Sequence, residues 1–219
     1  MSPVLPNNDS SDGDIDNESV RYHHGNLRLA LLNASIEQIK MVGVEKLSLR
    51  NIARSIGVSQ TAPYRHFKNK NELLVEVAIH SFNELFTTGS SIIDPTAPAI
   101  DNLKASGIAY IHYAMNNPEK YRLLFGNIIQ NRNEYPNLIE ASEQSFQLLV
   151  NLVKSGIESG DYIDESPLLL ANTLWTQVHG IASLILDGFY HNKELSMSLN
   201  DFIIAQIEIG SRALNNTQN

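Results

Sequence analysis

Polar and cationic side chains between residues 59 and 70 have the chemistry of a surface that binds nucleic acid. Gln60 offers an amide that can pair bidentately with adenine, and the methyl group of Thr61 can pack against that of thymine. Both residues, with Ala62 beside them, are expected in the first turn of a helix, where side chains reach deepest into a groove. Arg50 is near enough in sequence to contact either a guanine or a phosphate, and the sequence leaves both open.

Two short helices joined at Gly57 are expected to position these groups. The first is predicted from apolar residues that recur at i, i+3, i+4 and i+7, namely Leu49, Ile52, Ala53 and Ile56. Ser48 is placed as the N-cap of this helix, and Gly57 ends it. Ser59 is expected to cap the second helix, with Pro63 and Phe67 pointing inward. This spacing is typical of a helix-turn-helix unit.

The predicted helix N-termini also suit phosphate binding. The first backbone N–H groups of a helix lack intrahelical partners and carry a partial positive charge. Ser48, Ser59 and the start of a third helix at Lys70 are therefore candidate phosphate sites, and Lys70 adds a full charge. Asn69 and Glu72 form a capping box that opens this third helix, predicted through residue 87, before a loop over 89–98.

The charge distribution supports this assignment, although the whole chain has a net charge of -8. Residues 20–80 contain nine Lys or Arg and only four Glu, whereas residues 1–19 contain five acids and no base. Residues 81–219 contain seven bases and fifteen acids. The basic charge is therefore concentrated around the motif, where a DNA-binding surface needs it.

From residue 22 to about residue 78 the sequence resembles the N-terminal domain of TetR-family transcriptional regulators. The residues that carry the resemblance are Ser48, Ile52-Ala53, Gly57-Val58-Ser59, Tyr64, His66-Phe67, Lys70 and Leu73. The resemblance implies that Tyr64 and His66 contact the DNA backbone, and Arg65 adds positive charge beside them. A purely structural role for His66 stays open.

The rest of the chain is predicted to be helical, which gives an all-α fold. Helices are expected near 26–42, 98–115, 118–125, 136–158, 167–190 and 198–214, with Asn117 and Ser166 as caps and a proline following each of them. Three regions are predicted. They are a disordered acidic tail (1–19), a DNA-binding domain (20–80, motif 48–67) and an effector-binding and dimerisation domain (81–219).

The C-terminal region is rich in aromatic residues with polar tips, as expected of a cavity for a small apolar ligand. The candidate ligand-binding residues are Tyr110, Tyr113, Phe125, Phe146, Trp175 and His179. Trp175, His179 and Gly180 resemble a Trp/His-Gly signature of one TetR C-terminal subclass. The alternative for these aromatics is an ordinary helical core.

The resemblance also implies a homodimer formed by the last two helices, bound to a near-palindromic double-stranded DNA operator. We expect a repressor that a small apolar or aromatic effector releases. The alternative is a TetR-like DNA-binding adaptor controlled by a protein partner. An enclosed cavity beside Trp175 favours the first, and a fully packed core favours the second.

Other classes of protein fit the sequence less well. The chain contains no Cys, which excludes disulfides and thiolate metal sites, and the adjacent His23 and His24 diverge too far to favour a metal. A catalytic triad is suggested by the residue types of His179, Ser183 and Asp187. The outer two lie about 12 Å apart along a helix, which is too far for a triad. No cofactor, catalysis or membrane span is expected, because no apolar run approaches the roughly 20 residues a bilayer requires. We expect a cytoplasmic protein.

Overall fold

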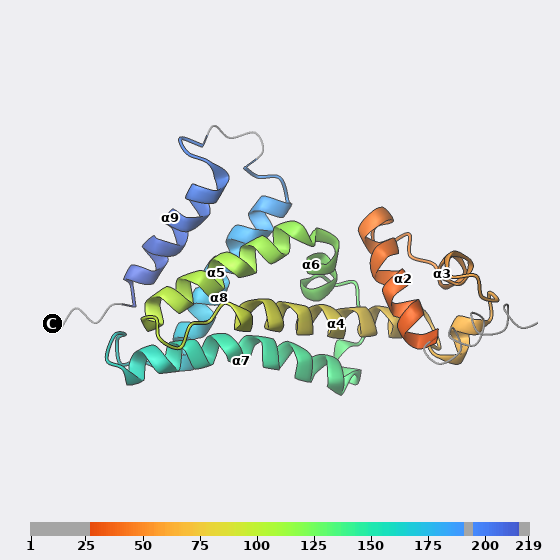
Figure 1. Ribbon diagram of the computed structural model, residues 1–219, viewed down its shortest axis with the longest axis horizontal. Helices are drawn as coiled ribbons and strands as arrows, with labels where there is room; N and C mark the ends of the chain where they lie inside the picture. The colour runs from red at the N-terminus through yellow and green to blue at the C-terminus, as the bar shows by residue number, and fades with distance from the viewer. Residues whose placement is uncertain (1–26, 191–194, 215–219) are drawn as a thin grey trace, which may run out of the picture.

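The computed structural model describes residues 27–190 and 195–214, and every regular element in these ranges is helical (Figure 1). The α-helices are α2 (Leu27–Val42), α3 (Leu49–Ser55), α4 (Lys70–Ser91), α5 (Ala99–Asn116), α6 (Pro118–Phe125), α7 (Pro136–Glu158), α8 (Pro167–Leu186) and α9 (Leu199–Arg212). Two 3-10 helices are η1 (Ala62–Arg65) and η2 (Arg132–Glu134). The all-α prediction is confirmed. The predicted tail at 1–19 and the histidines at 23 and 24 lie outside the described residues.

The molecule is elongated, with α2 and α3 at one end and α5, α7, α8 and α9 forming a body at the other (Figure 1). The long helix α4 begins beside α2 and runs into the body, where it packs along α7 and α5. Helix α5 also contacts α8 and α9, and α6 lies between α2 and the body. Helix α4 therefore connects both ends of the molecule.

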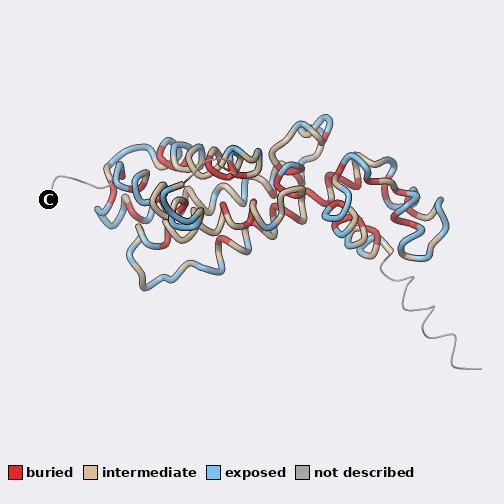
Figure 2. Tube along the Cα trace, turned by 90° about the horizontal axis from the view of Figure 1, so that it is seen from above, coloured by how far each residue is buried: buried red, intermediate tan, exposed pale blue. Residues whose placement is uncertain are grey.

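Buried residues run along the interior from one end to the other (Figure 2). One apolar cluster includes Leu31, Ile52 and Phe67 near the motif and continues to Leu85 and Leu138 in the body. The apolar core is therefore continuous along α4. The domain boundary predicted at residue 80 falls within this core and stays a prediction.

Most predicted helix ends agree with the structure. Pro118, Pro136 and Pro167 each occupy a first helical position, and the Ser166 hydroxyl accepts from the Leu169 N–H at 3.4 Å. Asn117 occupies the predicted N-cap position of α6, but its side chain makes no capping hydrogen bond there. Its amide instead donates to the carbonyl of Tyr113 at 3.1 Å, so the side chain closes α5 rather than opening α6.

Helix α4 continues beyond its predicted end at residue 87, and the loop begins at residue 92 rather than 89. Gly89 lies buried within the helix, where a Cβ atom would come within 3.0 Å of the Leu148 side chain. This glycine permits α4 and α7 to approach closely. Its role is therefore packing within the helix rather than a helix stop.

Helix α8 is by length and composition apolar enough to cross a membrane, contrary to the sequence prediction. Its 20 residues include no Asp, Glu, Lys or Arg, although polar residues such as Asn172 and Gln177 interrupt its apolar runs. A helix packed within a protein passes the same test, and α8 packs against α5, α7 and α9. Leu168, Leu169 and Leu184 remain exposed.

Candidate nucleic-acid interface and ligand cavity

The turn after α3 fixes the geometry of the motif. Gly57 has a positive φ of 71°, a conformation that glycine adopts without strain. The Gly57 N–H bonds the Arg54 carbonyl at 3.2 Å, and the Val58 N–H bonds the Ala53 carbonyl at 2.9 Å. These two bonds form a Schellman motif, which ends α3 and redirects the chain.

The segment after this turn differs from the predicted α-helix. Only η1 forms, and the Ser59 hydroxyl lies 3.1 Å from that of Thr61 instead of capping a helix. Pro63 explains the difference, because it has no N–H to donate to the Ser59 carbonyl. That carbonyl accepts from the Ala62 N–H at 3.0 Å, which tightens the chain into a 3-10 turn. The prediction that Ser59 is an N-cap is wrong.

Ser48 occupies the predicted N-cap position of α3, but its hydroxyl makes no capping hydrogen bond. The backbone N–H of Ser48 donates to the Gln38 side chain at 3.4 Å, which anchors the start of α3 to α2. The hydroxyl is therefore not engaged by the first turn of α3.

The predicted contact residues share one outer surface of the motif. Pro63 and Phe67 are buried as expected, so the side chains between them turn outward. Those exposed to solvent are Arg50, Ser59, Gln60, Thr61, Tyr64, Arg65 and His66, whereas Ser48, Ala62 and Lys70 are half-buried. Tyr64 is 49% exposed, which is unusual for a large aromatic residue.

Unpaired positive charge is concentrated on this surface. The acids Glu37, Glu72 and Glu76 neutralise Lys40, Lys68 and Arg28, respectively. Within the described residues, no ion pair involves the motif cations Arg50, Arg54 and Arg65. These three acids therefore pair with cations outside the motif and leave the motif cationic, as binding to a polyanion requires.

Lys70 begins α4, and its Nζ donates to the Glu45 carbonyl at 2.9 Å. The Asn69 side chain caps the helix by accepting from the Glu72 N–H at 3.0 Å, as the capping box predicts. The Glu72 carboxylate reaches the N–H of Lys68 at 2.7 Å rather than that of Asn69. The N-terminus of α4 is thus rigidly held.

Asn71, which the sequence did not single out, joins the start of α4 to the body. Its amide nitrogen donates to the Gln130 carbonyl at 3.2 Å and to the Tyr135 hydroxyl at 3.0 Å. Its oxygen accepts from the Gln130 N–H at 3.0 Å. We call these three bonds the Asn71 clamp. The partners are about 60 residues away in sequence, so no local pattern signals them.

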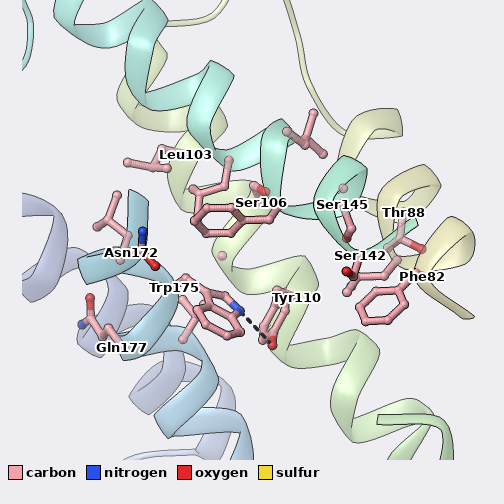
Figure 3. Close-up of a pocket in the computed structure, with 18 of the residues that line it drawn as sticks. Phe82, Thr88, Leu103, Ser106, Tyr110, Ser142, Ser145, Asn172, Trp175 and Gln177 are labelled. Carbon is pink, nitrogen blue, oxygen red and sulfur yellow. Dashed lines mark hydrogen bonds between the residues drawn. The ribbon is translucent and has the colours of Figure 1, made fainter. Parts of the chain in front are cut away.

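A cavity of about 390 Å³ lies in the body, between α4, α5, α7 and α8 (Figure 3). Its walls are mainly apolar and include the predicted Tyr110, Phe125, Phe146 and Trp175. The rings of Phe146 and Trp175 meet edge to face with centroids 5.9 Å apart. A volume and lining of this kind suit a small, largely apolar molecule.

The two other predicted ligand residues lie outside the cavity lining. Tyr113 is 6% exposed, and its hydroxyl donates to the Ser81 carbonyl at 3.0 Å, which ties α5 to α4. His179 lies behind Tyr110, with Nδ1 3.0 Å from the Tyr110 hydroxyl and 2.7 Å from that of Tyr121. These contacts place both residues in supporting positions rather than on the cavity surface.

A polar network links the cavity wall to His179. Trp175 Nε1–H donates to the Tyr110 hydroxyl at 3.3 Å (Figure 3), and the Tyr110 and Tyr121 hydroxyls are 3.2 Å apart. Each hydroxyl has one proton, so a chain of donation from Trp175 through Tyr110 and Tyr121 to His179 Nδ1 satisfies every member. This chain requires Nδ1 to be unprotonated.

Burial favours the neutral forms that the network needs. It raises the pKa of Tyr110 far above its usual value, and the neighbouring Tyr121 adds to that shift. Burial also raises the pKa of Tyr121 and lowers the pKa of His179. The tyrosines therefore keep their protons at neutral pH, and His179 keeps an acceptor nitrogen.

The geometry defines an all-α protein with a cationic helix-turn-helix end and a ligand-sized cavity at the other. Two family models match the chain. Residues 31–77 match the model described as "Bacterial regulatory proteins, tetR family", and residues 103–206 match "Tetracyclin repressor-like, C-terminal domain". The chain belongs to the TetR family. The second description names no subclass, so membership of the Trp/His-Gly subclass stays a prediction.

Curated proteins are similar to part of this chain in sequence. The HTH-type transcriptional regulator Rv1816 of Mycobacterium tuberculosis is 27% identical over 122 residues, which cover 54% of this chain and 52% of that protein. The chain thus spans about half the length of the first curated relatives it matches.

Two solved structures resemble the whole described fold. A protein with unknown function from Rhodococcus sp. RHA1 has a TM-score of 0.78 and 28% identity, over 89% of this chain and 98% of that one. The TetR-family transcriptional regulator PfmR from Thermus thermophilus has a TM-score of 0.62 and 19% identity, over 84% and 98%. The match to PfmR shows a shared fold alone.

The pKa of His179 makes stability depend on pH. Because folding lowers this pKa below the ordinary value of about 6.5, the unfolded chain binds more protons just below that pH. The stability due to neutral His179 is therefore present above pH 6.5 and is lost as pH falls towards the folded pKa. We predict that the thermal midpoint decreases between pH 7 and pH 5.5, and that His179→Asn, which keeps an acceptor but cannot titrate, reduces this decrease. An unchanged pH dependence in the variant would contradict the assignment.

Proposed function

We propose that this protein is a sequence-specific, dimeric DNA-binding transcriptional repressor that a small apolar or aromatic effector releases from its operator. The observation that carries the proposal is the position of α4. This one helix begins at the cationic motif with Lys70 and contributes Phe82, Leu85 and Gly89 to the cavity wall. A ligand that displaces the cavity end of α4 therefore moves the motif.

The exposed surface of the motif supports two kinds of DNA contact, one to bases and one to phosphates. We assign base recognition to Gln60, Thr61 and Ala62, because Gln60 and Thr61 are exposed just before η1 and Ala62 is its first residue. We assign phosphate contacts to residues that place charge or hydroxyl groups around them, namely Ser48, Arg50, Ser59, Tyr64, Arg65, His66 and Lys70. These contacts would make affinity depend steeply on salt.

Uncovered apolar surface on α8 and α9 supports a homodimer. Leu169 and Leu184 on α8 and Ile209 on α9 are exposed, and nothing lies within 4 Å of a Cβ placed on Gly180. A second copy packing there would form a four-helix interface and bury the apolar side of α8. The two motifs would then meet a near-palindromic operator with half-sites about 34–36 Å apart.

The Asn71 clamp supplies a route from cavity to motif. Arg132 lines the cavity and lies between Gln130 and Tyr135, the two residues that hold Asn71. A ligand that shifts this segment would change the position of Asn71 and the adjacent Lys70. Such a shift would alter the spacing of two motifs in a dimer and weaken operator binding.

The cavity beside Trp175 favours a small effector over control by a protein partner, because five aromatic residues line unfilled space there. We also assign residues 20–80 to DNA binding and 81–219 to effector binding and dimerisation. A cytoplasmic, non-enzymatic role follows from this assignment.

Substitutions in the motif separate base recognition from phosphate contact. We predict that Gln60→Ala relaxes the preference at one position per half-site, by about 1–3 kcal/mol, in DNA selected from random oligonucleotides. Lys70→Ala should weaken binding to all sequences alike and flatten the salt dependence by about one unit. Lys40→Ala, which removes an exposed cation paired with Glu37 on α2, is the matched control and should change neither property. An unaltered sequence preference in Gln60→Ala would contradict its role.

The Asn71 clamp can be tested without the effector. Asn71→Ala removes three hydrogen bonds and frees the motif to move against the body, so operator affinity should fall roughly tenfold. Affinity for a duplex with one half-site should be unchanged, because that complex does not depend on motif spacing. Tyr135→Phe removes only one of the bonds and should have a smaller effect. Equal losses on both duplexes would instead indicate damage to the motif itself.

A further inference from the structure

Arg132 places a guanidinium group in the mainly apolar lining of the cavity. It is the first residue of η2 and follows Asn131, whose positive φ of 52° turns the chain at this point. The Arg132 side chain makes no ion pair or hydrogen bond with any of the residues that the structure describes. It is therefore a half-buried charge with no protein counter-charge.

Such a charge is unfavourable in an apolar wall. Burial lowers the pKa of Arg132, which reflects the loss of solvation, yet a guanidinium stays protonated in proteins. A charge that cannot be removed by titration is stabilised only by water or by an anion. A ligand that excludes water from the cavity must then bring the anion itself.

The other charged groups of the lining leave an excess of positive charge. They are Lys104 on α5, which is half-buried, and Glu143 on α7, which is exposed. Glu143 forms no ion pair with Arg132 in the structure, and solvent screens its charge. Two cations thus face one screened acid.

We infer that the effector is an amphipathic carboxylate, with an apolar or aromatic tail against Phe125, Phe146 and Trp175 and its carboxylate on Arg132. This inference rests on the proposed function and specifies its ligand. The planar guanidinium matches a carboxylate with two parallel hydrogen bonds, and one negative charge balances it. A phosphate ester, with nearly two negative charges, would need Lys104 as a second counter-charge beside Arg132.

Trp175 is the only tryptophan of the chain and lines the cavity, so its fluorescence reports occupancy directly. The probes are decanoate, 1-decanol and decyltrimethylammonium, which share a tail and differ in head-group charge. We expect decanoate to bind roughly tenfold or more tightly than 1-decanol, since a charge-assisted pair forms only with the anion. Decyltrimethylammonium should bind weakest.

Variants at the two cations identify the residue responsible. Arg132→Gln should abolish the preference for decanoate over 1-decanol while keeping 1-decanol binding, and Arg132→Lys should retain part of it. Lys104→Gln is the matched control and should keep the preference. Arg132→Lys also keeps the test decisive should Arg132→Gln fail to fold, because a change in the preference between two ligands does not follow from altered stability.

The outcomes separate this inference from the function on which it rests. Equal binding of decanoate and 1-decanol, unaffected by Arg132→Gln, would overturn the carboxylate inference and leave an effector cavity in place. The same holds for tighter binding of decyltrimethylammonium, or for a preference lost in Lys104→Gln alone. If none of the three probes changes the Trp175 fluorescence, both the carboxylate inference and the effector model fail.

Discussion

The burial of α4 is the constraint on which the rest of the structure depends. At its start, Leu73 and Leu74 belong to the same apolar cluster as Phe67 of the motif, and farther along Leu85 is both buried and part of the cavity wall. A helix of 22 residues extends roughly 33 Å and bends little once one side is packed. Motif and cavity are therefore attached to one rigid element. Any change in packing at one end reaches the other as a rotation or shift of the whole helix.

Local chemistry explains which parts of the fold could be predicted from the sequence. Apolar periodicity and the positions of proline and glycine act over a few residues, so helices such as α6 and α7 begin where their prolines predict. The errors arise where two local effects compete. Pro63 has no N–H to donate to the Ser59 carbonyl, so a 3-10 turn forms there instead of an α-helix. The Asn117 amide donates to the Tyr113 carbonyl, so it does not cap α6. Residue types alone do not rank such alternatives.

The candidate site was predictable to the extent that it follows from one helix or one turn. Burial of Pro63 and Phe67 forces their neighbours outward, so the exposure of Gln60 and Arg65 followed from the motif. Contacts between distant segments carry no such signal. Tyr113 continues the side of α5 that lines the cavity, but α4 supplies its acceptors at Ser81 and Glu84. The Asn71 clamp and Arg132 depend on a non-repetitive segment after α6, and only tertiary structure places them.

The two polar features of the cavity wall are not equivalent. Trp175, Tyr110, Tyr121 and His179 satisfy one another through an unbroken set of hydrogen bonds, so this side of the wall is complete without a ligand. Arg132 has no such partner and is the group that gains most from one. The same short segment contains Arg132, which would bind the ligand, and Gln130 and Tyr135, which hold Asn71 at the start of α4. Ligand binding and movement of α4 would therefore depend on neighbouring residues. The network holds Trp175 and Tyr110 in place, so we expect a ligand that pulls on Arg132 to displace η2 rather than this part of the wall.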